Sequence, residues 1–398
     1  MSAAPTLPPL AVYVHFPWCV SKCPYCDFNS HALREVLPED RYVAALISDL
    51  HIQAARVTGG AVSRPIHSVF MGGGTPSLFS PAAIARVIEA LRAALPLSAE
   101  TEITMEANPA TVERGRFEEY RAAGINRVSL GAQSFDPSAL KALGRIHQVE
   151  DVYRAAGELH ACGLTNFNLD LMYALPGQKV AGALSDLIAA LLLNPAHLSH
   201  YQLTLEPGTV FAHDPPPLPD EDLAFAMQEE CHAVLAERGF ARYETSAFAR
   251  EGRQCAHNLN YWNFGDYLGI GAGAHGKLTR QEGDFRIVER STHLREPRRY
   301  QATAAMGPEW REVAPQDLPF EFMMNALRLT TGFPAAIYNE RTGLSMETVQ
   351  GTLSRLSGEG LLEAFDQGWR PSPRGQLFLN EVIARFLPRP NSQAGAGS

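Results

Sequence analysis

Apolar residues along the first 275 positions follow two alternating patterns. Short runs rich in valine, isoleucine, leucine and phenylalanine predict strands covered on both faces, and longer stretches with apolar residues three and four positions apart predict helices. The predicted strands are 11–16, 67–71, 102–107, 126–131, 167–173 and 198–205. The predicted helices are 39–56, 81–95, 111–123, 149–162, 179–193 and 220–238. This regular alternation predicts an α/β fold with a parallel sheet built of six βα units.

Six βα units are compatible with a partial TIM-type barrel or with an open, doubly wound sheet, and periodicity does not separate the two. After about residue 275 the pattern becomes charged and less regular, and a new helical pattern begins near Pro319. Its predicted order, helices followed by a hairpin through EAFDQGWRPS and a last helix, resembles a winged-helix α+β domain. We therefore expect a barrel domain over 1–305, a second domain over 306–390 and a disordered tail over 391–398.

Charge and composition narrow the possible partners. The chain has 398 residues, with 34 Lys and Arg against 43 Asp and Glu, so a broad cationic face for nucleic acid is not expected. The longest purely apolar run, Leu187 to Leu193, is far too short to span a membrane, and the first residues do not form a signal peptide pattern. We expect a cytoplasmic protein that is not an integral membrane protein and does not bind nucleic acid.

Three of the six cysteines are close together in YVHFPWCVSKCPYCDFNSH, at the end of the first predicted strand. Cys19, Cys23 and Cys26 form a Cys-x3-Cys-x2-Cys run that a tight loop can gather around one iron-sulfur cube. Three thiolates leave one iron of a four-iron cluster without a protein ligand, which favours a chelating small molecule there. The alternative is a zinc site completed by His15 or His31.

The same run resembles the cluster loop of the radical S-adenosylmethionine (SAM) superfamily, to which Lys22, Pro24 and Tyr25 also correspond. The resemblance implies that the three cysteines bind a 4Fe-4S cluster, that SAM occupies the open iron, and that Tyr25 flanks the adenine. Tyr13, on the strand before the loop, is also expected at the SAM site. In such enzymes the cofactor carries the chemistry and the protein supplies orientation.

Two glycine-rich segments stand out, and the first follows a predicted strand. MGGGTPSLF contains Gly72, Gly73, Gly74 and Thr75, and it resembles the superfamily's GGE-type segment, which implies that its backbone binds the amino end of SAM. Taken alone, it would be an ordinary strand-exit turn. The second segment, GAGAHG over 271–276, spells a dinucleotide fingerprint but is not followed by a convincing helix. The resemblance implies that it lies beside SAM.

Single polar residues stand where later strands end. Glu106 and Asp170 belong to the predicted strands 102–107 and 167–173, and Gln133 comes shortly after 126–131. Arg145 follows in LGRIH. Each alone would be an ordinary hydrogen-bonded residue, but in a barrel they converge on one mouth with the cysteines. The resemblance implies that Glu106 and Arg145 lie near the carboxylate end of SAM, with Gln133 and Asp170 toward the ribose.

Within the superfamily, the whole chain looks like the oxygen-independent coproporphyrinogen III oxidase group, and in particular its HemW heme chaperone branch. Phe28 stands where the oxidases carry a fourth cysteine, and the covering N-terminal extension of the oxidases is shorter here. HNLNYW matches the HNxxYW motif of the chaperone branch, which implies heme-binding residues His257, Asn258, Tyr261 and Trp262. Cys255 is a rival ligand, because thiolate also binds heme iron.

The resemblance thus implies a heme chaperone without coproporphyrinogen oxidase activity, on a scaffold able to cleave SAM. Its partners would be heme and acceptor hemoproteins, including membrane-associated respiratory enzymes, and it would form a homodimer. The alternative is an oxygen-independent oxidase that decarboxylates coproporphyrinogen III to protoporphyrinogen IX. A third class, a winged-helix regulator that senses redox state through its cluster, is disfavoured by the acidic balance of the chain.

Overall fold

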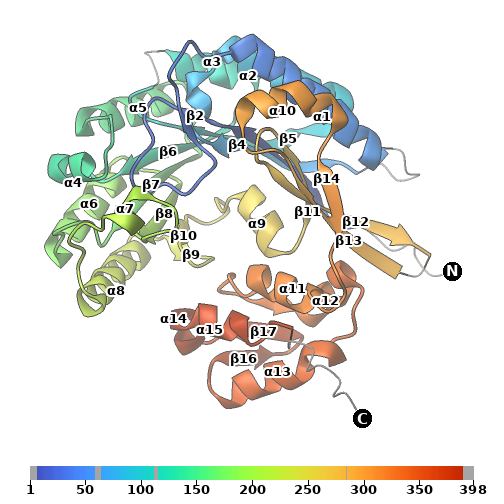
Figure 1. The fold of residues 1–398 in the computed structure, drawn as a ribbon. Helices are drawn as coiled ribbons and strands as arrows, with labels where there is room; N and C mark the ends of the chain where they lie inside the picture. The colour runs from blue at the N-terminus through green and yellow to red at the C-terminus, as the bar shows by residue number, and fades with distance from the viewer. Residues whose placement is uncertain (1–6, 59–63, 112–114, 284, 389–398) are drawn as a thin grey trace.

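A large curved sheet forms the centre of the molecule (Figure 1). The computed structural model describes residues 7–58, 64–111, 115–283 and 285–388. Seven neighbouring strands of the sheet run parallel, in the order β11-β1-β4-β5-β6-β7-β8. Within the described residues β14 and β9 are the two edges of the sheet, so it is an open, partial barrel. This confirms the predicted fold class.

Six of the parallel strands correspond to the six predicted ones. The parallel strands are β1 (Leu10–Phe16), β4 (Ile66–Gly73), β5 (Leu97–Ala107), β6 (Arg127–Gln133), β7 (Phe167–Tyr173), β8 (His197–Gln202) and β11 (Asp266–Ile270). β8 ends three residues earlier than expected. β11 was not predicted, because its short run DYLGI lies between glycine-rich turns and has little strand pattern of its own.

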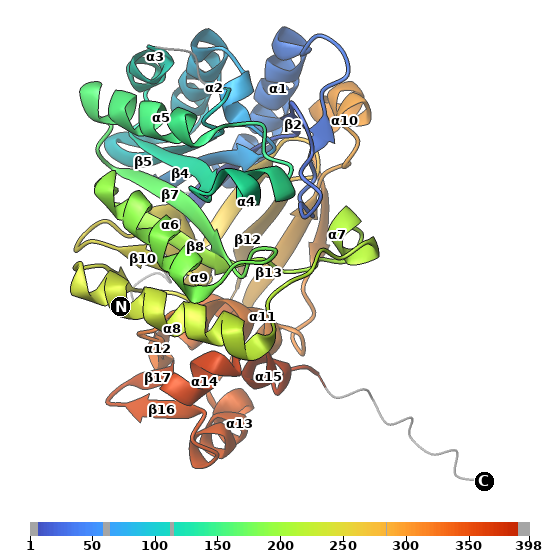
Figure 2. The ribbon, with the colours of Figure 1, turned by 90° about the vertical axis from the view of Figure 1, so that its left-hand side faces the viewer.

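Helices cover the outer face of the sheet, as Figures 1 and 2 show. They are α1 (Glu39–Thr58), α2 (Pro81–Ala94), α3 (Arg116–Ala123), α5 (Val149–Ala161), α6 (Val180–Leu192) and α8 (Glu221–Glu237), joined by the short α4 (Pro137–Ala142) and α7 (Val210–His213). Local signals set their ends: the Ser80 and Asp220 side chains cap α2 and α8, and Gly124 closes α3 in the left-handed conformation. Residues 112–114 of the predicted helix 111–123 lie outside the described part.

The charged stretch after residue 275 is more regular than its sequence suggested. It forms an antiparallel hairpin that extends the sheet beyond β11. The elements here are β12 (His275–Glu282), β13 (Phe285–Thr292), α10 (Pro297–Thr303), a 3-10 turn (Ala304–Met306) and β14 (Glu309–Glu312). Charged residues pair between elements: Glu289 of β13 accepts from Arg280 of β12 and from Arg56 of α1.

The remaining elements of this half of the chain are small. Two short strands, β2 (Trp18–Cys19) and β3 (His31–Ala32), pair with each other at the cysteine loop, and a 3-10 turn (Pro76–Leu78) follows the glycine run. β9 (Ala241–Arg242) and β10 (Ala247–Ala249) extend the sheet past β8. Helix α9 (Ala256–Trp262) lies in the opening of the curved sheet (Figure 1).

A second hydrophobic core lies below the sheet in Figure 1 and is built largely from the C-terminal residues. Its elements are α11 (Leu318–Ala326), β15 (Phe333–Pro334), α12 (Ala335–Thr342), α13 (Glu347–Gly358), β16 (Leu362–Phe365), β17 (Gly368–Pro371), α14 (Pro373–Leu377) and α15 (Leu379–Ala384). The order of elements follows the winged-helix-like pattern, except that two short helices, α14 and α15, stand in place of the one last helix that was expected. The limits 1–305 and 306–390 stay a prediction, and the tail 391–398 lies outside the described residues.

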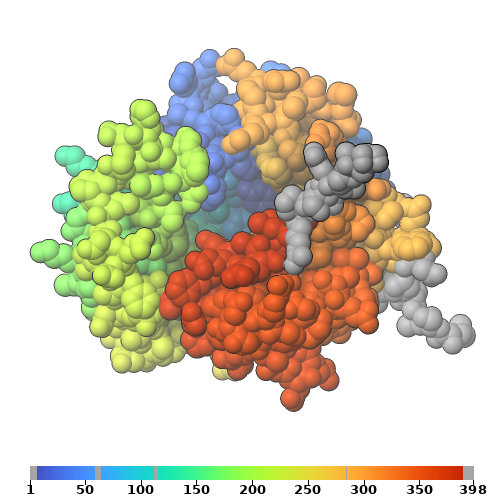
Figure 3. Space-filling model, turned by 60° about the horizontal axis from the view of Figure 1, so that its bottom comes forward, coloured from blue at the N-terminus to red at the C-terminus, as the bar shows by residue number. Residues whose placement is uncertain are grey.

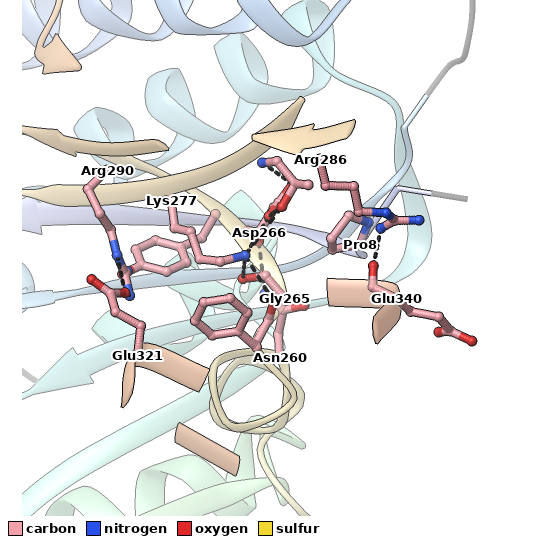
Figure 4. Close-up of polar contacts among 12 residues, drawn as sticks. Pro8, Asn260, Gly265, Asp266, Lys277, Arg286, Arg290, Glu321 and Glu340 are labelled. Atoms are coloured by element: carbon pink, nitrogen blue, oxygen red, sulfur yellow. Dashed lines mark hydrogen bonds and ion pairs between the residues drawn. The ribbon is translucent and has the colours of Figure 1, made fainter. Parts of the chain in front are cut away.

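The two cores meet at α9 and the hairpin. Phe264 packs edge-on against Phe322 of α11, and the buried Lys277 lies over the Phe264 ring while its Nζ donates to Asp266 at 2.8 Å. Arg290 of β13 donates through Nε to Glu321 of α11 at 2.9 Å (Figure 4). These contacts place the C-terminal domain directly against the open side of the sheet. Among the described residues, no helix is long and apolar enough to cross a membrane.

Candidate functional site

A cavity of about 340 Å³ lies at the carboxyl ends of the parallel strands. The surface is hollowed between the N-terminal segment, the yellow-green helices and the C-terminal domain in Figure 3. The cavity is lined by predicted site residues from many separate parts of the chain: Cys19, Cys23, Tyr25, Cys26, Gly73, Gly74, Thr75, Glu106, Gln133, Arg145 and Asp170. The parallel order of the strands explains this convergence, because their carboxyl ends meet on one side of the sheet.

The cysteine loop is held by its own residues. Lys22 Nζ donates to the carbonyls of Phe28 and Ser30 at 3.0 and 3.1 Å, closing the loop around the three thiols. His15 is engaged on both ring nitrogens, with Nε2 2.9 Å from the Asn29 carbonyl and Nδ1 3.0 Å from the Tyr13 hydroxyl. His15 is therefore a structural support of the loop and is not available as a zinc ligand.

The three thiols border one cavity, and their number matches the three protein ligands that a four-iron cluster with one open iron requires. Cys19, Cys23 and Cys26 all border the same cavity, yet the described residues contain no group of three or more His, Cys, Asp or Glu side chains gathered to hold one metal ion. Structural zinc requires four close ligands, whereas an iron-sulfur cube needs thiolates spread around it. Burial raises the pKa of the Cys19 thiol, and a hydrogen bond with Thr75 only partly opposes that shift, so the neutral thiol is favoured until a metal displaces its proton.

The glycine run is built for close approach of backbone. Gly73 has φ +108°, and a Cβ there would lie 2.2 Å from the His15 ring, while a Cβ at Gly74 would lie 2.6 Å from the Trp18 carbonyl oxygen. Gly74 N and Thr75 N donate to the Phe16 and Trp18 carbonyls at 2.7 and 2.8 Å. With these N–H groups used inside the protein, the turn offers oxygen acceptors, which suit an ammonium group.

Two carboxylates share the floor of the cavity. Glu106 Oε2 accepts from Gly73 N at 3.0 Å, and Asp170 accepts from Asn168 Nδ2 at 2.8 Å and Ser129 Oγ at 3.2 Å. Burial, and then the nearby charge of Asp170, raise the pKa of Glu106 to about 8. Glu106 is therefore mostly neutral at pH 7 and can donate a hydrogen bond to an anion.

A buried guanidinium lies beside the cysteines. Arg145 Nη2 donates to the Gly131 carbonyl at 2.9 Å, and Nη1 lies 3.6 Å from Cys23 Sγ. Its Nε is buried without a hydrogen-bond partner. A buried donor without a partner is costly, so this group is set to receive an anionic ligand.

Gln133 occupies a strained position at the end of β6. Its φ is +69°, in the left-handed region, and the register with β7 shifts at this point. Its Oε1 accepts from the Tyr201 hydroxyl at 2.7 Å. Tyr201 and Ser199 of β8 also line the cavity and were missed from the sequence, because both lie inside the predicted strand 198–205 and not at its end.

Three expectations for this site differ from the structure. Tyr13 and Gly72 do not line the cavity, and Tyr13 lies deeper, stacked on Phe70 and bonded to His15. The glycines at 271–276 do not line it either. A Cβ at Gly271 would meet the His15 carbonyl at 2.5 Å, and Asn29 Nδ2 donates to the Ala272 carbonyl at 2.9 Å. This segment therefore supports the cysteine loop from behind.

A hydrogen-bonded chain runs through the sheet interior away from Asp170. Asn168 Nδ2 donates to Asp170, and the side-chain oxygen Oδ1 of Asn168 lies 2.7 Å from His197 Nδ1. His197 Nε2 lies 2.9 Å from the Tyr243 hydroxyl, whose oxygen accepts from Cys255 N at 3.4 Å. The chain links the cavity to the start of α9.

The hexapeptide HNLNYW, predicted to bind heme, makes up all of α9 except its first residue. His257 is only 1% exposed, its Nδ1 lies 3.1 Å from Ser68 Oγ, and its ring stacks on Phe70 at 5.2 Å. Cys255 is also buried, and its thiol donates to Glu102 at 3.4 Å. Trp262 faces the C-terminal domain, with Arg328 4.4 Å from its ring centre. Contacts between distant segments bury this histidine, and sequence periodicity does not show them.

Comparison with known proteins first defines the class. Residues 13–183 match the radical SAM superfamily and residues 313–378 match the HemN C-terminal domain. The structure is similar to that of coproporphyrinogen III oxidase (HemN) from Escherichia coli, a radical SAM enzyme, with a TM-score of 0.79 over 95% of this chain and 90% of that one. Sequence identity there is 24%, so this likeness shows the fold. The fold and the cysteine loop define a radical SAM protein, a class that implies a 4Fe-4S cluster and SAM.

Curated relatives define the branch. The chain is 48% identical over 381 residues to heme chaperone HemW from Escherichia coli, covering 96% of this chain and 99% of the relative. It is 45% identical to heme chaperone HemW from Haemophilus influenzae, with the same coverage. It is 36% identical to the mitochondrial radical S-adenosyl methionine domain-containing protein 1 of Bos taurus, and the match covers 98% of this chain and 89% of the relative. The chain belongs to the HemW family.

Proposed function

We propose that this protein binds heme and delivers it to acceptor hemoproteins. The observation that carries the proposal is the 48% identity to a curated heme chaperone, because it extends over 96% of the chain and so includes both the barrel and the C-terminal domain. Phe28 in place of a fourth cysteine supports the same conclusion against porphyrinogen decarboxylation. A cytoplasmic location, a homodimer and membrane-associated respiratory enzymes as acceptors stay predictions.

Cys19, Cys23 and Cys26 would hold the 4Fe-4S cluster. We expect each Cys→Ala substitution to lower the iron and sulfide content of anaerobically reconstituted protein sharply. Cys162, half-buried on the outer helices, is the matched control, and Cys162→Ala should leave that content unchanged. Equal iron loss in all four variants would contradict the assignment.

SAM would lie in the same cavity. When bound together, the cluster and SAM supply reductive cleavage of a sulfonium bond. The glycine turn would offer oxygens to the SAM ammonium, and Arg145 and neutral Glu106 would offer donors to the SAM carboxylate. Asp170 would accept hydrogen bonds from the ribose hydroxyls, with Gln133 beside it. Asp170→Ala should weaken SAM binding in calorimetric titration while the cluster content stays constant, and Asp170→Asn should weaken it less. Unchanged affinity would remove Asp170 from the site.

Two assays test the proposed function: transfer of hemin to an acceptor, and conversion of coproporphyrinogen III. Hemin-loaded protein should lose its Soret absorbance to an added apo-hemoprotein, and reconstituted protein with SAM and a reductant should leave coproporphyrinogen III unchanged. Conversion to protoporphyrinogen IX would favour the oxidase instead. His257, Asn258, Tyr261 and Trp262 remain the predicted heme residues, and His257→Ala with unaltered hemin affinity and Soret band would contradict a direct role for that imidazole.

A further inference from the structure

Helix α9 is closed over its own histidine. The His257 ring faces the sheet, where its Nδ1 lies 3.1 Å from Ser68 Oγ and the ring stacks on Phe70. A histidine that binds heme iron must present a ring nitrogen to a space that admits a porphyrin. His257 is buried, so a porphyrin does not reach it in this arrangement. Heme binding through His257 therefore requires α9 to leave its place.

A single carboxylate of β5 holds the first turn of α9. Glu102 Oε1 accepts from His257 N at 3.3 Å and from the Cys255 thiol at 3.4 Å. Its other oxygen, Oε2, accepts from Ala256 N at 3.2 Å and lies 3.9 Å from Nε of Arg127 on β6. The position of His257 is thus set by contacts with neighbouring strands as well as by the helix itself.

The C-terminal domain closes the other end of α9. Arg328, shortly after α11, lies over the Trp262 ring, 4.4 Å from its centre, and its Nη2 donates to Glu244 at 3.2 Å. Phe264, just past the helix, packs edge-on against Phe322 of α11. Helix α9 is therefore enclosed between the strands of the sheet and the C-terminal domain (Figure 1).

The closed position of α9 leaves polar groups unsatisfied and strains the backbone. Within the described residues, four side-chain nitrogens around α9 are buried with no hydrogen-bond partner: Arg127 Nε, His257 Nε2, Trp262 Nε1 and Arg328 Nε. Phe264 has φ +54°, in the left-handed region that bulky side chains rarely adopt. Both features raise the free energy of the closed state and so favour opening.

Together these contacts describe a gate that is closed in the ligand-free protein. We propose that α9 is this gate and must leave Ser68 and Glu102 before heme reaches His257; this rests on the proposed function, with His257 as an iron ligand. The contact of Arg328 with Trp262 holds the gate from the side of the C-terminal domain, so that domain controls how often it opens. Heme then binds only the open fraction of molecules, and its association is slowed by that fraction.

Hydrogen–deuterium exchange of the ligand-free, anaerobically reconstituted full chain measures the opening. Ser68→Ala removes the hydrogen bond to His257, and the loss of one such bond favours the open state about fivefold. Amide exchange over 257–262 should therefore be about fivefold faster than in the parent, with exchange in α5 unchanged. Ser354→Ala, at an exposed serine of α13, is the matched control and should exchange like the parent. Equal acceleration in α5 would indicate general destabilisation and count against a gate.

A second variant tests the contact made by the C-terminal domain. Arg328→Met removes the charge over the Trp262 ring, so exchange over 257–262 should again be faster than in the parent. Arg355→Met, at an exposed arginine of α13, is the matched control and should exchange like the parent.

Stopped-flow absorbance at the Soret band measures whether hemin uses this opening. At low hemin concentration the association rate is proportional to the open fraction, so in Ser68→Ala and Arg328→Met it should rise by the same factor as exchange. Parent-like exchange in both variants would overturn the proposal, as would faster exchange without faster hemin association. A parent protein that does not bind hemin at all would instead refute the proposed function, so the two failures are distinguishable.

Discussion

Replacing Glu106 with glutamine should change the pH dependence of stability in a defined direction. The ordinary pKa of this carboxyl, 4.5, rises to about 8 in the fold because of burial and then the charge of Asp170. The folded state thus keeps a proton that the unfolded state releases above about pH 4.5, so Glu106 lowers the free energy of unfolding as pH rises from 4.5 to 8. A shift of one pKa unit corresponds to about 1.4 kcal/mol, so the full loss in the free energy of unfolding is on the order of 5 kcal/mol.

Urea denaturation of ligand-free parent and Glu106→Gln at pH 5 and pH 9 measures this cost. Glutamine keeps an oxygen for Gly73 N but cannot ionise, so the variant should gain on the order of 4 kcal/mol over the parent between the two pH values. Glu100→Gln, at an exposed residue of the same strand, is the control and should show no such gain. A stability difference between Glu106→Gln and parent that is equal at pH 5 and pH 9 would refute the reasoning.

Three further predictions concern the cavity and the interior. Arg145→Met removes the buried charge beside Cys23, so the cluster should be reduced at a potential roughly 60 mV more negative in a redox titration, and an unchanged potential would contradict the contact. Gly74→Ala should lower the free energy of unfolding by about 1–3 kcal/mol and reduce cluster content, whereas Gly157→Ala, with open space around it, should do neither. Asn168→Ala leaves buried partners unsatisfied and should cost about 1–3 kcal/mol in urea denaturation, with parent-like stability counting against the hydrogen-bonded chain.

The part of the site carried by local motifs was predictable. The three cysteines, the glycine turn and the polar residues at strand ends were found because short-range spacing specifies a loop, and parallel strands bring their ends together. Tyr201 was missed because it lies in the middle of the predicted strand 198–205, which in the structure ends at Gln202. The GAGAHG segment was misplaced because its packing behind His15 depends on how β11 pairs with β1, a contact between residues far apart in the chain.

The sequence by itself determined the α/β class, the cysteine loop and the family resemblance, because periodicity and motif spacing are local properties of the chain. Only the tertiary structure decided that HNLNYW is a helix with a buried histidine, that the charged stretch is a hairpin extending the sheet, and that the C-terminal domain closes one end of α9. Burial and cavities arise from contacts between distant segments. Such contacts depend on strand order and domain packing, which no local pattern encodes.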